Sequence, residues 1–134
     1  RADLYRSILE GIAFGIRHNL GTMNEEGVQP KRILAVGGGT KNPLWLQIVS
    51  DVCNIELNVP EEQIGACYGD AFLAGVGVGM FNKLSDIKQW VHIKYRIKPN
   101  PEIQNKYEIN YLVFRQLYIQ TRSLIHTLAN NLAD

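Results

Sequence analysis

The sequence has few of the residues that hold stapled or metal-bound proteins together. Its 134 residues include two cysteines, Cys53 and Cys67, which form no CxxC pair. Two thiols at this spacing argue against a disulfide scaffold or a zinc site. The histidines His18, His92 and His126 lie far apart, without a partner four residues away, so metal ligation is not expected. Low cysteine content is typical of a reducing compartment, and we expect a cytoplasmic setting.

The sequence also lacks an excess of charge of one sign and a leader segment. Fourteen basic residues face 13 acidic ones, with no basic stripe, so no nucleic-acid partner is expected. The opening RADLYRS has no apolar core after its charges, unlike a signal peptide. The nearly uncharged run 64–81 has the GxxxG spacing of membrane helices. Asp70 lies inside that run, so we predict a helix buried on a sheet and no membrane partner.

The composition that remains is that of an ordinary globular domain. Hydrophobic residues make up 46% and charged residues 20% of the chain. A chain of this length can bury a core without staples. No repeat, low-complexity tract or linker interrupts it, so residues 1–134 are predicted to form a single domain.

The predicted elements alternate between helix and strand. In chain order they are a helix over 3–23, a strand over 32–36, a helix over 43–53, a half-buried strand over 55–59, a helix over 65–81, a turn or short helix over 84–90, an ambiguous segment over 92–99 and a helix over 101–131. This order predicts the α/β class, with parallel strands covered by helices and a long C-terminal helix. Two strands are few for this many helices, so further strands are expected before residue 1.

Local signals place several side chains within these elements. Asn42-Pro43 and Asn100-Pro101 are typical helix starts, with Asn as the cap. Trp45 is predicted to fill the core, and Asp51 to be solvated. Apolar side chains at helical spacing predict one buried stripe along the last helix. The stripe consists of Ile103, Tyr107, Tyr111, Phe114, Tyr118 and Ile125.

The most informative segment is AVGGGTKNPLWLQ, residues 35–47, where a strand, a glycine turn and a helix start follow one another. Glycines allow a ligand close to the backbone, and helix N-terminal amides suit anions or polar ligand edges. The segment is not a P-loop, and Asn42 replaces the third glycine of a dinucleotide fingerprint, which disfavours an oxidoreductase. On these residues alone, a ligand turn and a plain strand-to-helix connection both stay open.

Three blocks of the chain resemble the FGGY family of carbohydrate kinases, and its xylulose kinases in particular. GGGTKNPLWLQIVSDV (37–52) is similar to the family's adenosine-side motif. LEGIAFGIRHNL (9–20) resembles the helix before it, and GACYGDAFLAGVGVGMF (65–81) resembles the small-residue helix that closes the nucleotide side. Asp70 departs from the pattern, where the family usually has a small apolar residue.

The resemblance implies a place for this chain in a larger enzyme. Family members have two domains of the ribonuclease-H-like, actin-type ATPase fold with a cleft between them. The N-terminal domain carries the sugar and the catalytic base, and the C-terminal domain holds ATP. On the matching positions, Gly38 and Gly39 would contact the adenosine and Asn42 would hydrogen-bond the base, with Thr40 and Lys41 lining the pocket. Each has a simpler interpretation, because Asn42 can serve only as a cap and Lys41 can be solvated.

The resulting hypothesis is the ATP-binding part of a kinase that transfers the ATP γ-phosphate to a sugar hydroxyl. A xylulose-like pentulose is favoured, with gluconate, glycerol or another polyol open. Phosphoryl transfer also needs Mg²⁺ and a base. The chain shows no acidic strand-end motif and no base beside the glycines, so we expect it to be inactive alone, with the metal ligands and sugar site elsewhere. The alternative is a non-catalytic binding or assembly module. Strand 32–36 would lack neighbours, which predicts a homo-oligomer.

Overall fold

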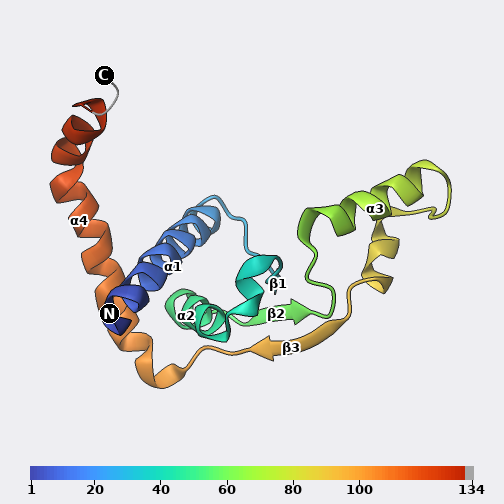
Figure 1. Ribbon diagram of the computed structural model, residues 1–134, viewed down its shortest axis with the longest axis horizontal. Helices are drawn as coiled ribbons and strands as arrows, with labels where there is room; N and C mark the ends of the chain where they lie inside the picture. The colour runs from blue at the N-terminus through green and yellow to red at the C-terminus, as the bar shows by residue number, and fades with distance from the viewer. Residues whose placement is uncertain (132–134) are drawn as a thin grey trace.

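The computed structural model describes residues 1–131, a mixed α/β arrangement of helices around a small sheet (Figure 1). The helices are α1 (Ala2–Glu25), α2 (Pro43–Cys53), α3 (Gly65–Gly77) and α4 (Gln104–Asn131), with 3-10 turns η1 (Gly38–Lys41), η2 (Leu84–Gln89) and η3 (Pro101–Ile103). The strands are β1 (Ile33–Leu34), β2 (Leu57–Pro60) and β3 (Ile93–Ile97). The predicted α/β class and the long C-terminal helix are confirmed.

The sheet is mixed, in the order β1-β2-β3. β1 runs parallel to β2, with Ile33 opposite Leu57. β3 runs antiparallel to β2, with Ile97 opposite Leu57. The expectation of parallel strands is therefore confirmed for β1 and β2 and wrong for β3, the segment that the sequence left ambiguous. The segment with α3 and η2 lies beyond the end of β2 (Figure 1), so the chain re-enters the sheet at the end where β2 leaves it and β3 runs antiparallel.

The middle strand β2 is buried along its whole length, so the prediction of a half-buried strand is wrong. Leu57 and Val59 belong to the main core. Asn58, which the alternation would place in solvent, is only 7% exposed and donates a hydrogen bond from Nδ2 to the Ile33 carbonyl (3.3 Å). Because β2 lies between two strands, the Asn58 side chain finds a hydrogen-bond partner in the neighbouring strand β1 and does not need water.

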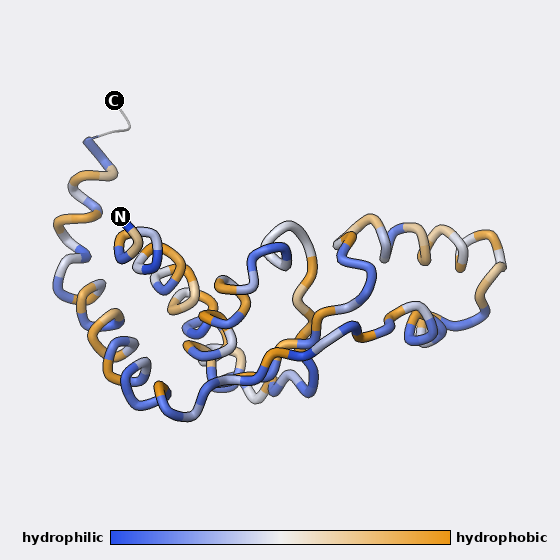
Figure 2. Tube along the Cα trace, turned by 60° about the horizontal axis from the view of Figure 1, so that its bottom comes forward, coloured by the Kyte–Doolittle hydropathy of each residue, from blue (hydrophilic) through white to orange (hydrophobic). Residues whose placement is uncertain are grey.

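One hydrophobic core joins α1, α2, β2 and the start of α4. Its buried residues are Ala13, Phe14, Leu46, Ile48, Val49, Val52, Leu57, Val59, Tyr107 and Tyr111. Figure 2 shows hydrophobic and hydrophilic stretches alternating along these helices, as expected where one face packs inward. Residues 1–60 and 93–131, which contain this core, are called the body below.

The predicted stripe of α4 is right for its first half and wrong for its second. Tyr107 and Tyr111 are buried, and Phe114 packs against them. Tyr118 and Ile125 are 52% and 46% exposed, because α4 continues past α1 and α2 (Figure 1). The start of the helix behaves as predicted, since the Asn100 side chain accepts a hydrogen bond from the Glu102 amide (3.0 Å).

Asp51 is 3% exposed, so the prediction of a solvated carboxylate is wrong. Its Oδ1 accepts hydrogen bonds from the Asn100 amide (2.8 Å) and from Gln47 Nε2 (2.9 Å). Burying a carboxylate is tolerated where donors of this kind meet it. The side chain therefore ties α2 to the turn that begins the C-terminal helix.

Residues 61–92, called the arm below, stand apart from the body at the end of the β2–β3 pair (Figure 1). Helix α3 ends at Gly77, four residues before the predicted end, because Gly79 takes a positive φ of 81° and reverses the chain. Phe81 then folds back and stacks on Phe72, with ring centroids 4.8 Å apart. A Cβ on Gly75 would lie 2.7 Å from Phe81, so this small residue serves ring packing. Within residues 1–131, no helix has the length and apolarity to cross a membrane.

Candidate functional site

The glycine turn leaves β1 and is shaped by backbone hydrogen bonds. Gly37 has a φ of 85°, a conformation that side-chain-bearing residues rarely adopt. Its carbonyl accepts from the Thr40 amide (3.1 Å), and its own amide donates to the Gln63 carbonyl (2.9 Å). The turn is thus closed on itself and tied to the segment between β2 and α3.

The side chains of Thr40 and Gln63 hold the glycine turn in place through hydrogen bonds. Thr40 is 5% exposed, and its hydroxyl lies 2.6 Å from the Gly37 carbonyl and 2.5 Å from the Gln63 carboxamide oxygen. A hydroxyl has one proton, so it can donate to only one of two acceptors. A half-turn of the Gln63 amide would present its NH₂ instead and satisfy both contacts. Thr40 therefore supports the turn from inside.

Asn42 begins α2 and is held at both ends of its carboxamide. Oδ1 accepts from the Trp45 amide (3.2 Å), as an N-cap does. Nδ2 donates to the Tyr5 hydroxyl near the start of α1 (3.0 Å). The predicted cap is confirmed, and one amide hydrogen remains beyond these two bonds.

The three glycines of the turn face different surroundings. Gly37 requires its positive φ. A Cβ on Gly39 would lie 3.1 Å from the Trp45 indole nitrogen, so Gly39 is exposed on one side and pressed by Trp45 on the other. A Cβ on Gly38 would meet no atom of the described residues within 4 Å. The backbone is therefore openly accessible at Gly38.

The space in front of Gly38 is a cleft of about 340 Å³. Its lining residues come from the turn and from the start of α3: Gly37, Gly38, Lys41, Gln63, Ile64 and Gly65. Lys41 brings the only formal charge among them, and the first turn of α3 has no side-chain cap. Uncapped helix amides carry partial positive charge, so the cleft suits an electron-rich or anionic ligand. Its volume is at the small end of ligand pockets, enough for part of a nucleotide.

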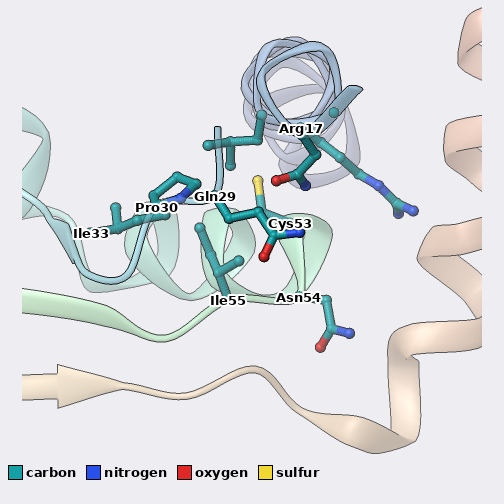
Figure 3. A pocket seen from close by; sticks show the side chains of 10 residues that line it. Arg17, Gln29, Pro30, Ile33, Cys53, Asn54 and Ile55 are labelled. Atoms are coloured by element: carbon teal, nitrogen blue, oxygen red, sulfur yellow. The ribbon is translucent and has the colours of Figure 1, made fainter. Parts of the chain in front are cut away.

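A second cavity of about 520 Å³ lies at the other end of α2 (Figure 3). The Cys53 sulfur points toward α1, and burial raises the pKa of this thiol to about 11, although the nearby Arg17 cation acts in the opposite direction. Arg17 extends away from the cavity and binds the Val52 carbonyl (3.2 Å) and the Glu108 carboxylate. The Cys53 thiol is therefore mostly protonated near neutral pH, which makes it a poor nucleophile. The Arg17 guanidinium already has partners within the protein.

Position in the sheet favours the smaller cleft. It lies where the parallel strands β1 and β2 end, at the glycine turn and at residues 63–65. Ligands of open α/β sheets bind outside the carboxyl ends of the strands. The larger cavity includes Ile33 and Ile55, at the amino ends of β1 and β2.

The cleft can bind, but its lining contains neither a carboxylate nor a histidine. Among residues 1–131, no cluster of three or more His, Cys, Asp or Glu side chains could hold a metal ion. The lining of this cleft therefore offers no carboxylate to a metal ion and no carboxylate or imidazole that could act as a base.

The site differs in part from the one that sequence reasoning assembled. Gly38 and Lys41 line the cleft, whereas Gly39 and Asn42 follow them in sequence without being among its lining residues, and Thr40 lies within the turn. The other contributors come from distant segments: Gln63, Ile64, Gly65 and Tyr5. For Gly65 there was a signal, since it opens the block that resembles the helix closing the nucleotide side.

Comparisons with known proteins show which family the chain resembles. Residues 1–78 match the C-terminal domain of the FGGY family of carbohydrate kinases. A xylulose kinase of Staphylococcus epidermidis is 30% identical over 125 residues, covering 92% of this chain and 25% of the relative. The xylulose kinase structure from Rhodospirillum rubrum has a TM-score of 0.78 at 28% identity, over 92% of this chain and 25% of its own. The Plasmodium falciparum glycerol kinase structure with ADP has a TM-score of 0.63 at 26% identity, over 82% and 23%.

The chain thus spans about a quarter of the length of the relatives it matches. The family match covers 78 of its 134 residues and includes α1, the glycine turn, α2 and α3. On this match, the chain belongs to the FGGY family of carbohydrate kinases, and residues 1–78 correspond to the family's C-terminal domain.

Proposed function

We propose that this chain binds the adenosine part of ATP or ADP in the cleft between the glycine turn and the start of α3. The observation that carries the proposal is the open backbone at Gly38, at the carboxyl ends of two parallel strands. The Plasmodium falciparum relative was solved with ADP, which supports a nucleotide as the ligand. Gly38 and Gly39 would face the adenosine, and the free amide hydrogen of Asn42 would meet the base. Thr40 would act from within the turn.

In this proposal the chain is the nucleotide-holding part of an enzyme that transfers the ATP γ-phosphate to a sugar hydroxyl. We infer that its three strands are part of a ribonuclease-H-like sheet. A xylulose-like pentulose is the favoured acceptor, because xylulose kinases are among the similar proteins. A glycerol kinase is among them too, so other polyols stay open. Since the lining of the cleft has neither a carboxylate nor a histidine, a coupled ADP-release assay should show no sugar-dependent turnover by the 134-residue chain.

An ADP titration followed by NMR tests the binding proposal. The amide signals of Gly38, Gly39, Asn42 and Gly65 should shift, with a dissociation constant around millimolar (about −4 kcal/mol) for half a site. Shifts confined to residues outside the cleft would refute the assignment.

Gly38→Val is the sharpest variant, because its φ is not in the positive region and its Cβ would meet open space. The side chain should fill the cleft and abolish binding while the melting temperature stays unchanged. Gly77→Val is the matched control, since that position is equally open but lies at the end of α3. Gly39→Val is less clean, because it would also push against Trp45.

We also propose that the isolated chain self-associates. Within the described residues, β1 pairs with β2 only, so its other edge is open. On α1, Leu4, Ile8 and Ile12 are each more than half exposed. Open edges and apolar faces favour pairing with another chain, most simply as a two-fold dimer. Sedimentation over a wide concentration range should show a dimer, and a strict monomer at high concentration would contradict this.

A further inference from the structure

The orientation of the Asn42 carboxamide is fixed by its surroundings. A backbone amide can only donate, so the atom facing the Trp45 amide must be the oxygen, Oδ1. Nδ2 is thereby directed to the Tyr5 hydroxyl, 3.0 Å away, whose oxygen accepts the bond. Without the bond to Tyr5, the cap would fix only the position of Oδ1, and the carboxamide plane could rotate so that the NH₂ group points in other directions.

Tyr5 reaches this position from a distant part of the sequence. It lies in the first turns of α1, 37 residues before Asn42, and is 52% exposed. Tyr5 is not part of the main hydrophobic core, so packing of its ring does not by itself account for its position. The hydroxyl contact with Asn42 is the polar interaction that Tyr5 makes within the described residues.

We propose that Tyr5 is a positioning residue of the nucleotide site, whose hydroxyl sets the direction in which Asn42 presents its remaining amide hydrogen. This inference rests on the proposed function, in which that hydrogen meets the base. Tyr5 acts through Asn42: it orients the donor and does not replace it. The start of α1 is thereby a part of the site that the glycine motif does not contain.

The test uses ADP titrations of the 134-residue chain and three substitutions. Tyr5→Phe removes only the hydroxyl and should weaken ADP binding about three- to tenfold, the range of one lost hydrogen bond. Asn42→Ser keeps a capping oxygen but removes the carboxamide, and should weaken binding at least as much. Tyr118→Phe is the matched control, because Tyr118 is also 52% exposed but lies on α4, and should change nothing.

The double variant, Tyr5→Phe with Asn42→Ser, separates positioning from direct contact. If Tyr5 acts through Asn42, the double variant binds ADP as Asn42→Ser does. A second readout needs no ligand: in Tyr5→Phe the side-chain NH₂ signals of Asn42 should shift, while the Trp45 amide signal, still capped, should stay in place.

Three outcomes would overturn the role of Tyr5. One is ADP binding by Tyr5→Phe that equals binding by the unsubstituted chain. Another is a double variant weakened by the product of the two single effects, which would indicate independent contacts. The third is an unchanged pair of Asn42 side-chain signals in Tyr5→Phe. Failure of the proposed function looks different, because the unsubstituted chain would then bind no ADP, and the role of Tyr5 would fall with it.

Discussion

The body and the arm each enclose a buried phenylalanine, yet they are held together differently. In the body, Phe14 lies among Tyr107, Tyr111 and Phe114, with ring centroids 5.4 to 6.3 Å away. In the arm, Phe72 meets Phe81 and Trp90 at 4.8 and 5.4 Å. The aromatic contacts are alike, but only Phe14 belongs to the main core.

Polar contacts deepen the contrast. In the body, the Tyr107 hydroxyl accepts from Arg6 (2.9 Å) and donates to Glu10 (2.8 Å), so α1 and α4 are joined by hydrogen bonds as well as by packing. The arm is closed at its base by two contacts, from the Glu61 amide to the His92 carbonyl (2.9 Å) and from the Tyr68 hydroxyl to the Trp90 carbonyl (3.1 Å).

The candidate cleft spans the junction of these two regions. Gly37, Gly38 and Lys41 belong to the body, whereas Gln63, Ile64 and Gly65 belong to the arm. Gln63 binds the turn through its carbonyl and its side chain. One wall of the site therefore rests on the large core and the other on a small aromatic cluster. Predictions that separate the two regions also separate the two walls.

The largest expected effect comes from Phe14→Ala. Removing a ring from the main core should lower the free energy of unfolding by about 3–5 kcal/mol. Urea denaturation followed by far-ultraviolet circular dichroism measures it. Met23→Ala, on the same helix but 41% exposed and outside the proposed pairing face, is the control and should stay within about 0.5 kcal/mol. A loss below about 1 kcal/mol for Phe14→Ala would mean that this core does not govern global stability.

Phe72→Ala should have a smaller global effect, although Phe72 is only 1% exposed. A region with its own small cluster can open without unfolding the rest. We expect the global free energy of unfolding to fall by less than about 1 kcal/mol. Amide hydrogen exchange should quicken across residues 65–90 and stay unchanged in α1 and α2. A global loss as large as that of Phe14→Ala would show that arm and body unfold as one unit.

The same contrast explains which parts of the fold the sequence could predict. The helices of the body carry periodic apolar residues and caps such as Asn42, so α2 was predicted at its observed bounds, 43–53. β3 was ambiguous because Lys94, Tyr95 and Arg96 are exposed on an edge strand, where the pattern of a buried strand does not arise. The burial of Leu57 and Val59 arises in the core shared with α1, α2 and α4, and that of Asn58 involves its bond to Ile33, contacts that no local pattern records.

Asp51 shows a different limit. Its carboxylate is buried because the Asn100 amide, 49 residues later, comes to meet it. No local pattern records a partner at that distance. The candidate site divides in the same way: the glycine turn is contiguous and could be predicted as a motif. Gln63 and Tyr5 reach the turn only through the tertiary fold, 23 residues after Thr40 and 37 residues before Asn42.

The experiment that perturbs the molecule least is chemical labelling of its two cysteines, one in each region. Cys53, in the body, is partly buried and its thiol pKa is raised to about 11 by burial, whereas Cys67, on α3, is exposed. Alkylation requires the thiolate. At pH 8, only about 0.1% of Cys53 would be ionised, since pH 8 lies about three units below that pKa. Iodoacetamide should therefore modify Cys67 first, as peptide mass spectrometry would show. Cys53 should react faster as the pH rises toward 11, and Cys53→Ser should leave the first labelling step unchanged. Equal labelling of both thiols at pH 8 would show that the body neither shields the Cys53 thiol nor raises its pKa, and this difference between the two regions would then be lost.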